Sequence, residues 1–265
     1  MIKEYNIEEI YRRQIGYGSL GMTNKFFKDN YWYKQNNKGY EGKSEYLVTK
    51  ILDNSDIGNY ASYEECIING VPGCRSKNFL NEGESLITLS RLYNLTYGGD
   101  LKNKINSYVL LSDRIEYVMD FVNEFTGLDI HNYLGKVLKI DMLTYDVDRH
   151  FNNLAIIKTN DGYKEAPLFD YGASYFSMQH VFTDNMSLAE KIKKMTPQPF
   201  SASFEEQAMY FQDVEISLDY DGITRAIKNE SSELQEIILF NLDRYKFMFN
   251  DKKIVRELDA IDIER

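Results

Sequence analysis

The sequence predicts an α+β protein with two lobes, a β-rich N-terminal lobe and a mainly helical C-terminal lobe. Short segments rich in aromatic residues and turn residues, typical of strands, fill much of the first 92 residues. From residue 112 onward, hydrophobic residues recur at three- and four-residue steps, which is the helical period. One hairpin pattern interrupts this helical part. We therefore expect an N-lobe of residues 1–92 and a C-lobe of residues 93–265.

The composition is that of a globular protein. Of the 265 residues, 43% are hydrophobic and 27% are charged, so the chain can bury a sizeable core. The net charge of −10 argues against a protein that coats nucleic acid. Two cysteines cannot form a disulfide framework, and no hydrophobic run approaches the ~18 residues of a membrane span. We expect a cytoplasmic protein.

The N-lobe pattern begins with a glycine-punctuated stretch at residues 16–21. A hairpin should follow, because Asp29 and Asn30 favour a turn between two aromatic segments. Its strands are predicted over 25–27 and 31–34. A helix over 43–52, with Ser44 as its candidate cap, and strands over 65–68 and 86–89 complete this lobe.

The C-lobe pattern consists of three clear helices and one hairpin. Gly127 is expected to end the first of these helices. Residues 160–162, Asn-Asp-Gly, predict the turn of the hairpin. The helices are predicted over 112–125, 131–143 and 234–249, and the two hairpin strands over 154–157 and 167–169.

Polar residues flank this hairpin in a pattern that suits phosphoryl transfer. Asp148 and Asn153 lie five residues apart before its first strand, and Asp170 follows its second. Kinases use one Asp for the acceptor hydroxyl, and an Asn and a second Asp for Mg²⁺. An Asp- and Asn-rich loop alone is often only a turn. Here the loop follows a glycine stretch, a strand lysine and a helix glutamate along the chain, and this order favours a phosphotransferase.

The chain resembles the HipA-like serine/threonine kinases, a branch of the protein-kinase-like fold. Residues 148–153 (DRHFNN) match the Asp-x-His-x-x-Asn loop of that family, and Asp170 matches its metal-binding Asp. Residues 21–26 (GMTNKF) and 31–34 (YWYK) resemble its phosphate loop and ATP-binding Lys. The resemblance implies a two-lobed protein-kinase-like fold and an enzyme that uses ATP and Mg²⁺.

The resemblance also implies roles for individual residues. Asp148 would act as the base toward the acceptor hydroxyl, and Asn153 and Asp170 would hold Mg²⁺. Lys34 would pair with the α- and β-phosphates and with Glu45, for which Glu41 is the alternative. His150 is either a donor to the γ-phosphate or a core histidine. Arg149 either steadies the loop, contacts phosphate or forms a plain salt bridge.

Further nucleotide contacts are expected from the glycine stretch and from the connector between the lobes. Gly18, Ser19 and Gly21 would bring backbone N–H groups to the phosphates. Thr88 and Leu89 would read the adenine through the backbone. Phosphorylation of Ser19 or Thr23 would add negative charge where ATP brings its own, so we expect it to inhibit.

Two other functions remain open. Phosphoinositide kinases also carry an Asp-Arg-His-x-x-Asn loop followed by Asp-x-Gly, so a lipid or small-molecule kinase is one alternative. An inactive kinase-like binding module is the other. The expected partners are a protein substrate with Ser or Thr and an antitoxin or other regulatory protein, without direct nucleic acid binding.

Overall fold

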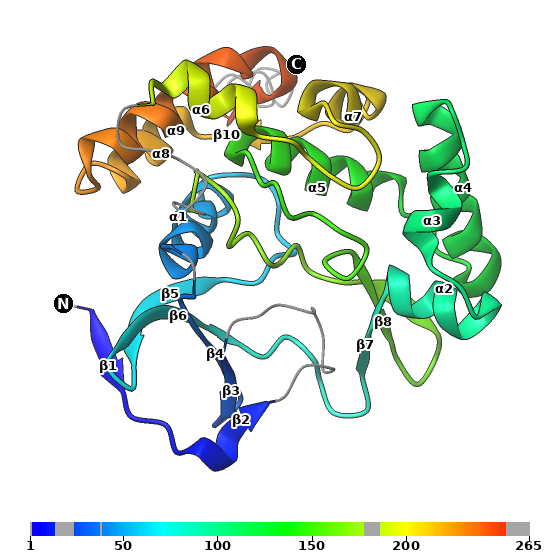
Figure 1. Cartoon of the computed structure of the whole chain (residues 1–265), viewed down its shortest axis with the longest axis horizontal. Coiled ribbons are helices and arrows are strands. Elements are labelled where there is room, and N and C mark those ends of the chain that lie inside the picture. Colours follow the sequence, from blue (N-terminus) through cyan, green and yellow to red (C-terminus); the bar gives the residue numbers. More distant parts are fainter. Residues whose placement is uncertain (1, 14–23, 38, 178–185, 253–265) are drawn as a thin grey trace, which may run out of the picture.

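The computed structural model describes residues 2–13, 24–37, 39–177 and 186–252. It has a β-rich N-terminal part and a mainly helical C-terminal part, which confirms the predicted α+β class (Figure 1). The glycine stretch with Gly18, Ser19 and Gly21, and also Thr23, lies outside the described residues.

The N-terminal sheet has the strand order β1-β5-β6-β4-β3-β2. Its central hairpin is the predicted one, with Lys25 opposite Lys34 and Phe27 opposite Trp32. Asp29 and Asn30 form the turn with φ angles of 51° and 62°, a left-handed backbone that these two residue types tolerate. The strands are β1 (Lys3–Tyr5), β2 (Arg12–Arg13), β3 (Lys25–Lys28), β4 (Tyr31–Gln35), β5 (Tyr63–Ile68) and β6 (Val71–Lys77).

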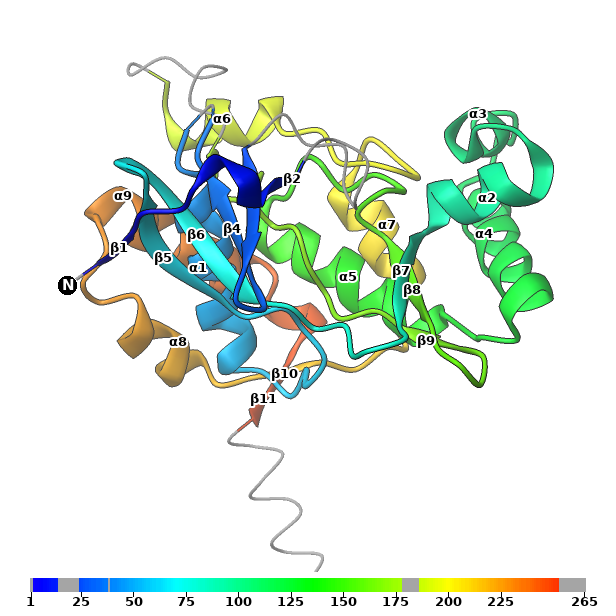
Figure 2. The ribbon, with the colours of Figure 1, turned by 90° about the horizontal axis from the view of Figure 1, so that it is seen from below.

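Helix α1 (Glu41–Asp53) lies close against this sheet (Figures 1 and 2). A Cβ atom on Gly42 would come within 2.4 Å of the carbonyl carbon of Gly73 on β6, so the glycine pair permits this close approach. Ser44 is not the helix cap, because α1 begins three residues earlier and Tyr40 takes the cap position. The Ser44 hydroxyl donates instead to the carbonyl of Ser174, 2.9 Å away.

A second sheet has the order β7-β8-β9 and joins the two halves of the sequence. Its strands are β7 (Ser85–Thr88), β8 (Ala155–Lys158) and β9 (Tyr163–Glu165). The expected strand over 167–169 is wrong, since β8 pairs with β9 and Leu168 only bridges to Tyr60. The predicted lobe boundary at residue 92 falls within α2.

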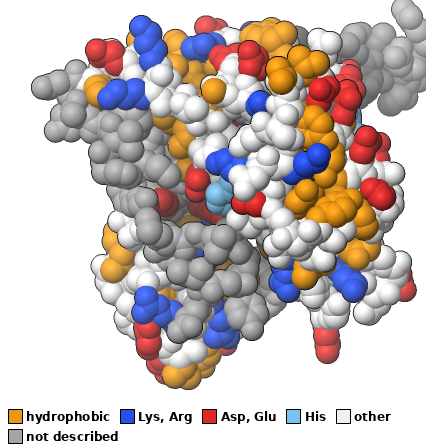
Figure 3. Space-filling model, turned by 45° about the vertical axis from the view of Figure 1, so that its right-hand side comes forward, with side chains coloured by type: hydrophobic (Ala, Val, Ile, Leu, Met, Phe, Trp, Pro, Cys, Tyr) orange, Lys and Arg blue, Asp and Glu red, His pale blue; other side chains and the backbone are white. Residues whose placement is uncertain are grey.

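The helices of the C-terminal part confirm two predictions closely. The expected helices over 112–125 and 131–143 are α4 and α5, and Gly127 ends α4 with a φ of 72°. Helices α2 to α4 lie together at the right of Figure 1. Figure 3 shows one face of the molecule, on which hydrophobic, basic and acidic side chains are interspersed. No helix in the described ranges has the length and hydrophobicity needed to cross a membrane. The helices are α2 (Leu89–Tyr97), α3 (Leu101–Ile105), α4 (Leu111–Thr126), α5 (His131–Thr144), α6 (Leu188–Lys194), α7 (Phe204–Tyr210), α8 (Tyr220–Ala226) and α9 (Ser232–Arg244).

Candidate active site

A cavity of about 330 Å³ lies between the N-terminal sheet, β7 and the loop at residue 170. Its lining combines apolar side chains with charged ones, namely two lysines, an arginine, a glutamate and an aspartate. This combination of an apolar wall with a few charged groups is typical of small-molecule sites. The lining residues include Lys25, Trp32, Lys34, Leu86, Phe169 and Asp170.

Lys34 on β4 connects three elements through its ammonium group. Its Nζ lies 2.7 Å from Oε1 of Glu45 on α1 and 2.7 Å from Oδ1 of Asp170. Burial opposes the charge, but Asp170 and Glu45 raise the pKa of Lys34 well above its usual value. Lys34 is therefore a fixed positive charge at the cavity wall.

Glu45 is the helix glutamate of this arrangement. It is 1% exposed, and its Oε2 accepts a hydrogen bond of 2.9 Å from the backbone N–H of Tyr171. The alternative, Glu41, accepts instead from the backbone N–H groups of Asn37 and Gly39. Glu45 therefore links the lysine of the sheet to the loop that carries Asp170.

Asp170 stands in a backbone conformation that few residues other than glycine adopt. Its φ is 62°, in the left-handed region. Two residues before Asp170, the backbone of Leu168 is held on both sides. Its N–H donates to the carbonyl of Asn59, and its carbonyl accepts from the N–H of Ala61. Such conformations persist where the surroundings fix them, and they cluster at functional sites.

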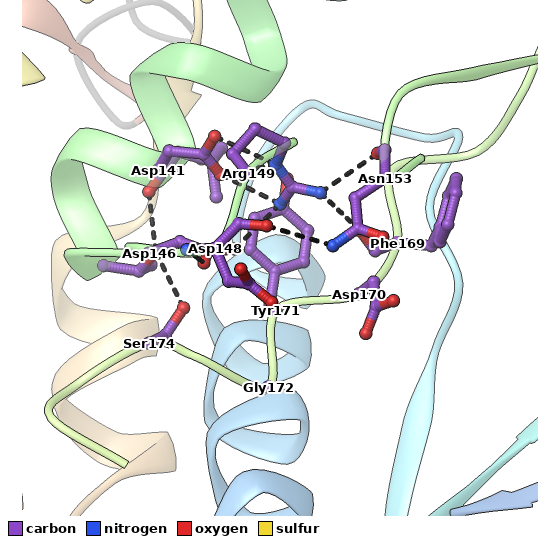
Figure 4. Close-up of polar contacts among 12 residues, drawn as sticks. Asp141, Asp146, Asp148, Arg149, Asn153, Phe169, Asp170, Tyr171, Gly172 and Ser174 are labelled. Atoms are coloured by element: carbon purple, nitrogen blue, oxygen red, sulfur yellow. Dashed lines mark hydrogen bonds and ion pairs between the residues drawn. The ribbon is translucent and has the colours of Figure 1, made fainter. Parts of the chain in front are cut away.

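The loop at residues 146–153 brings Asp148 and Asn153 next to this aspartate. The Asn153 side-chain amide donates to the carbonyl of Asp148 at 3.1 Å. In Figure 4 the guanidinium of Arg149 joins this loop to the segment that carries Asp170, through the carbonyls of Asn153 and Phe169. The three residues of the expected phosphoryl-transfer set therefore come from two loops that meet.

Arg149 holds these two loops together from the buried side. It is 1% exposed, and its guanidinium donates to both carboxylate oxygens of Asp141 at 2.9–3.2 Å and to Asp146 at 3.0 Å. Its Nη1 donates to the carbonyls of Asn153 (3.1 Å) and Phe169 (2.8 Å). Burial raises the pKa of Asp146 well above its usual range, and Arg149 opposes that shift. Of the roles considered for Arg149, the contacts fit both the salt bridge, which it forms with Asp141 and Asp146, and the steadying of the loop.

His150 is half-buried and does not line the cavity. Its Nδ1 is buried and has no hydrogen-bond partner among the described residues. The described contacts do not bring it to the lysine and aspartates, so its two interpretations stay open.

The structure favours a candidate for the adenine contact that lies nearer the N-terminus than the predicted Thr88 and Leu89. Leu89 is fully buried and does not line the cavity, and its backbone N–H donates to the carbonyl of Leu154 at 2.8 Å, so this donor is not available for a base. Thr88 does not line the cavity, and its hydroxyl caps α2. Because hydrogen bonding alternates along an antiparallel strand, the backbone groups of Leu86 face away from β8. Leu86, which lines the cavity, replaces Thr88 and Leu89 as the candidate.

Two oxygen ligands fit Mg²⁺. Asn153 Oδ1 is buried and lacks a hydrogen-bond partner in the described part of the chain. A buried oxygen without a partner is suited to bind a metal ion. Asp170 supplies a carboxylate at the cavity, and Mg²⁺ binds proteins through one or two such groups together with phosphates. Within the described ranges, no cluster of three or more His, Cys, Asp and Glu side chains offers a cage made by protein alone.

Lys25 and Trp32 line the cavity, and the motifs GMTNKF and YWYK contain them, but no individual contact was predicted for either side chain. The signal was available, since a two-residue turn fixes the register of a hairpin. Lys34 lies on the cavity face, so Lys25, which is directly opposite it on the neighbouring strand, lies on that face too. Trp32 shares the face because it is two residues before Lys34 on the same strand.

The fold and the cavity define a class: a two-lobed kinase-like chain in which a strand lysine, a helix glutamate and a loop aspartate meet. Comparison with solved structures supports the fold. The proinflammatory kinase CtkA of Helicobacter pylori matches with a TM-score of 0.59 at 16% identity, over 92% of this chain and 95% of that one. The predicted protein-kinase-like fold is therefore confirmed.

A second match is HipA from a toxin–antitoxin complex of Shewanella oneidensis MR-1 with HipB and operator DNA. It has a TM-score of 0.43 at 13% identity and covers 91% of this chain and 63% of that one. No family model matches the sequence, and no curated protein matches it.

Proposed function

We propose that the protein is a Mg²⁺- and ATP-dependent kinase that phosphorylates serine or threonine in another protein. The observation that carries this proposal is the meeting of Lys34, Glu45 and Asp170 at one cavity, with 2.7 Å from Lys34 Nζ to each carboxylate. Protein kinases require both the lysine–glutamate pair and the metal-binding aspartate for transfer.

Each part of the cavity then has a task. The apolar wall with Trp32 and Leu86 would enclose the nucleobase, and Lys34 would hold the α- and β-phosphates. Asn153 and Asp170 would hold Mg²⁺, which bridges phosphate oxygens and offsets the charge that develops on them. Asp148 would orient the acceptor hydroxyl and take its proton, a step typically worth about 10²–10⁴-fold in rate.

The choice of a protein hydroxyl rests on the resemblance of residues 148–153 and 170 to the HipA-like serine/threonine kinases. The regulatory partner, such as an antitoxin, follows from the same resemblance and stays a prediction. The alternative acceptor, a lipid or small molecule, is distinguished from a protein hydroxyl by the fraction that carries the label.

The test is incubation of the purified protein with Mg²⁺, ATP labelled on the γ-phosphate, and a lysate. We expect label on serine or threonine of protein, and none with Asp148→Ala. Label in the lipid or small-molecule fraction would contradict the choice of substrate. Absence of label in every fraction, with intact ATP binding, would show an inactive binding module.

A further inference from the structure

Two exposed cations, Arg91 and Lys102, lie beside the loop at residues 146–153 and have no task in the proposed function. Arg91 lies in the first turn of α2, and Lys102 lies in α3. Within the ranges that the structure describes, neither side chain forms an ion pair. The acid nearest to Lys102 along the chain, Asp100, accepts instead from backbone N–H groups at the start of α3. Both cations are therefore available to a carboxylate of another molecule.

Lys102 is one side chain away from the loop that carries the proposed base. Its Nζ donates to Oε1 of Gln198 at 3.1 Å, and Nε2 of Gln198 donates to the carbonyl of Val147 at 3.4 Å. Val147 immediately precedes the base. The segment that carries Gln198 is fixed against the loop, because the buried ring of Phe200 packs on that of Phe151 with 5.6 Å between the centroids. An ammonium group thus lies near the proposed base without lining the cavity.

Arg91 approaches the same loop from α2. The N–H of Ser90, its neighbour in the chain, donates to the carbonyl of Phe151 at 3.1 Å. The Arg91 side chain is exposed and also lines the cavity, so it lies where the cavity opens. Glu84, the glutamate of the same cavity, forms its ion pair with Lys164. Arg91 therefore presents a positive charge at this opening that no described carboxylate neutralises.

A protein that offers a hydroxyl to Asp148 has to lie beside these cations. An extended segment spans about 3.3–3.6 Å per residue, so the residues on either side of the acceptor come within reach of the two side chains. Opposite charges across an interface favour a partner, and like charges exclude one. On a chain with a net charge of −10, unpaired cations direct an acidic partner to their own position.

We propose that the protein acceptor is acidic in the residues that flank its serine or threonine, and that Arg91 and Lys102 bind these carboxylates. This inference rests on the proposed function and names the class of substrate on which it acts. Lys102 does not line the cavity, so its effect should fall on the acceptor and not on the nucleotide. A basic flanking segment is repelled by the same two charges.

The test starts from the sites that the wild type phosphorylates in a lysate, mapped by mass spectrometry. We expect aspartate and glutamate to be enriched within roughly five residues of the labelled serine or threonine, a reach of about 17 Å in an extended chain. The substrate protein with the strongest site is then purified, together with a version in which these acids are replaced by asparagine and glutamine. The catalytic efficiency kcat/KM for both substrates is measured with the wild type and with the variants.

We expect the wild type to prefer the acidic substrate by about 3- to 10-fold, as one or two exposed ion pairs provide. Lys102→Glu should abolish this preference and Lys102→Arg should keep it, with the KM for ATP unchanged in both. Arg91→Glu should also reduce it, and the fluorescence of Trp32, the single tryptophan, reports the ATP affinity of this variant separately. The matched control is Lys228→Glu, which should equal the wild type. This exposed lysine follows α8, which lies at the opposite end of the molecule from α3 (Figures 1 and 2).

The possible failures are distinguishable. Labelled sites without acidic neighbours would show that the inference is wrong, whereas the proposed function stands. A preference for acids that persists in both Lys102→Glu and Arg91→Glu would mean that other residues recognise them, and the assignment of these two cations would be wrong. A wild type that labels no protein overturns the proposed function, and the inference with it.

Discussion

Two charged clusters lie on either side of residues 169–171, and they differ in what their charges face. In the Arg149 cluster (Asp141, Asp146 and Arg149) every member is 2% exposed or less, and the guanidinium is enclosed by protein acceptors. In the cavity cluster (Lys25, Lys34, Glu45 and Asp170) both lysines and Asp170 line a cavity.

We propose that this difference separates ion pairs that stabilise the fold from ion pairs that serve the proposed function. The guanidinium donates to two carboxylates and two backbone carbonyls, so protein groups already fill its hydrogen-bonding capacity. The lysines of the cavity cluster can exchange partners when a ligand arrives. We therefore expect changes in the Arg149 cluster to affect stability and changes at the cavity to affect binding and catalysis.

The largest effect is expected for Asp148→Ala. Removal of the base should lower the rate of phosphoryl transfer by about 10²–10⁴-fold. The affinity for ATP should be kept, because Asp148 does not line the cavity and its proposed role concerns only the acceptor hydroxyl. The transfer rate is measured in single-turnover reactions, and the ATP affinity is measured by titration of the fluorescence of Trp32, which lines the cavity. Equal transfer rates in variant and wild type would remove Asp148 from the mechanism.

Arg149→Met should break the other cluster. It leaves the buried carboxylates of Asp141 and Asp146 without their cation, which typically costs about 3–5 kcal/mol in the free energy of unfolding. Urea denaturation measures this change.

The matched control is Arg12→Met, whose ion pair with Glu9 is exposed and should contribute only about 0–1 kcal/mol. Similar losses in both variants would show that burial does not distinguish the Arg149 cluster.

A smaller effect is expected at the contact that positions Glu45. In Gly42→Ala the new methyl group would meet the backbone of Gly73, and overpacking of this kind typically costs about 1–3 kcal/mol. A shift of α1 should also separate Glu45 from Lys34 and lower the transfer rate. Gly58→Ala is the control, because a Cβ there meets nothing within 4 Å. A Gly42→Ala protein with unchanged stability and rate would contradict the role of this contact.

The sequence predicted features that depend on local signals. Asp29 and Asn30 fixed the hairpin that carries Lys34, and Gly127 marked the end of α4. The loop at 148–153 was found because the kinase chemistry requires Asp and Asn at a set spacing. These signals act over a few residues, so they survive without knowledge of the tertiary structure.

Other features depend on packing between distant segments. Residues 167–169 are as hydrophobic as a strand, yet β8 pairs with the more polar residues 163–165 next to the turn. The candidate for an adenine contact moved to Leu86 because the N–H of Leu89 already donates to Leu154, and because Leu86 lines the cavity whereas Thr88 does not. The hydrogen bonds of Arg149 to four residues could not be predicted, because Asp141, Asp146, Asn153 and Phe169 come from separate segments of the chain.

The most direct test of the central claim is the binding of ATP to the wild type and to Asp170→Asn, with and without Mg²⁺, measured by calorimetry. The substitution keeps the size of the side chain and removes its charge. We predict that Mg²⁺ strengthens ATP binding to the wild type and has little effect on Asp170→Asn. An equal Mg²⁺ effect in the two proteins would contradict the account of Lys34, Asn153 and Asp170 as one magnesium–nucleotide site.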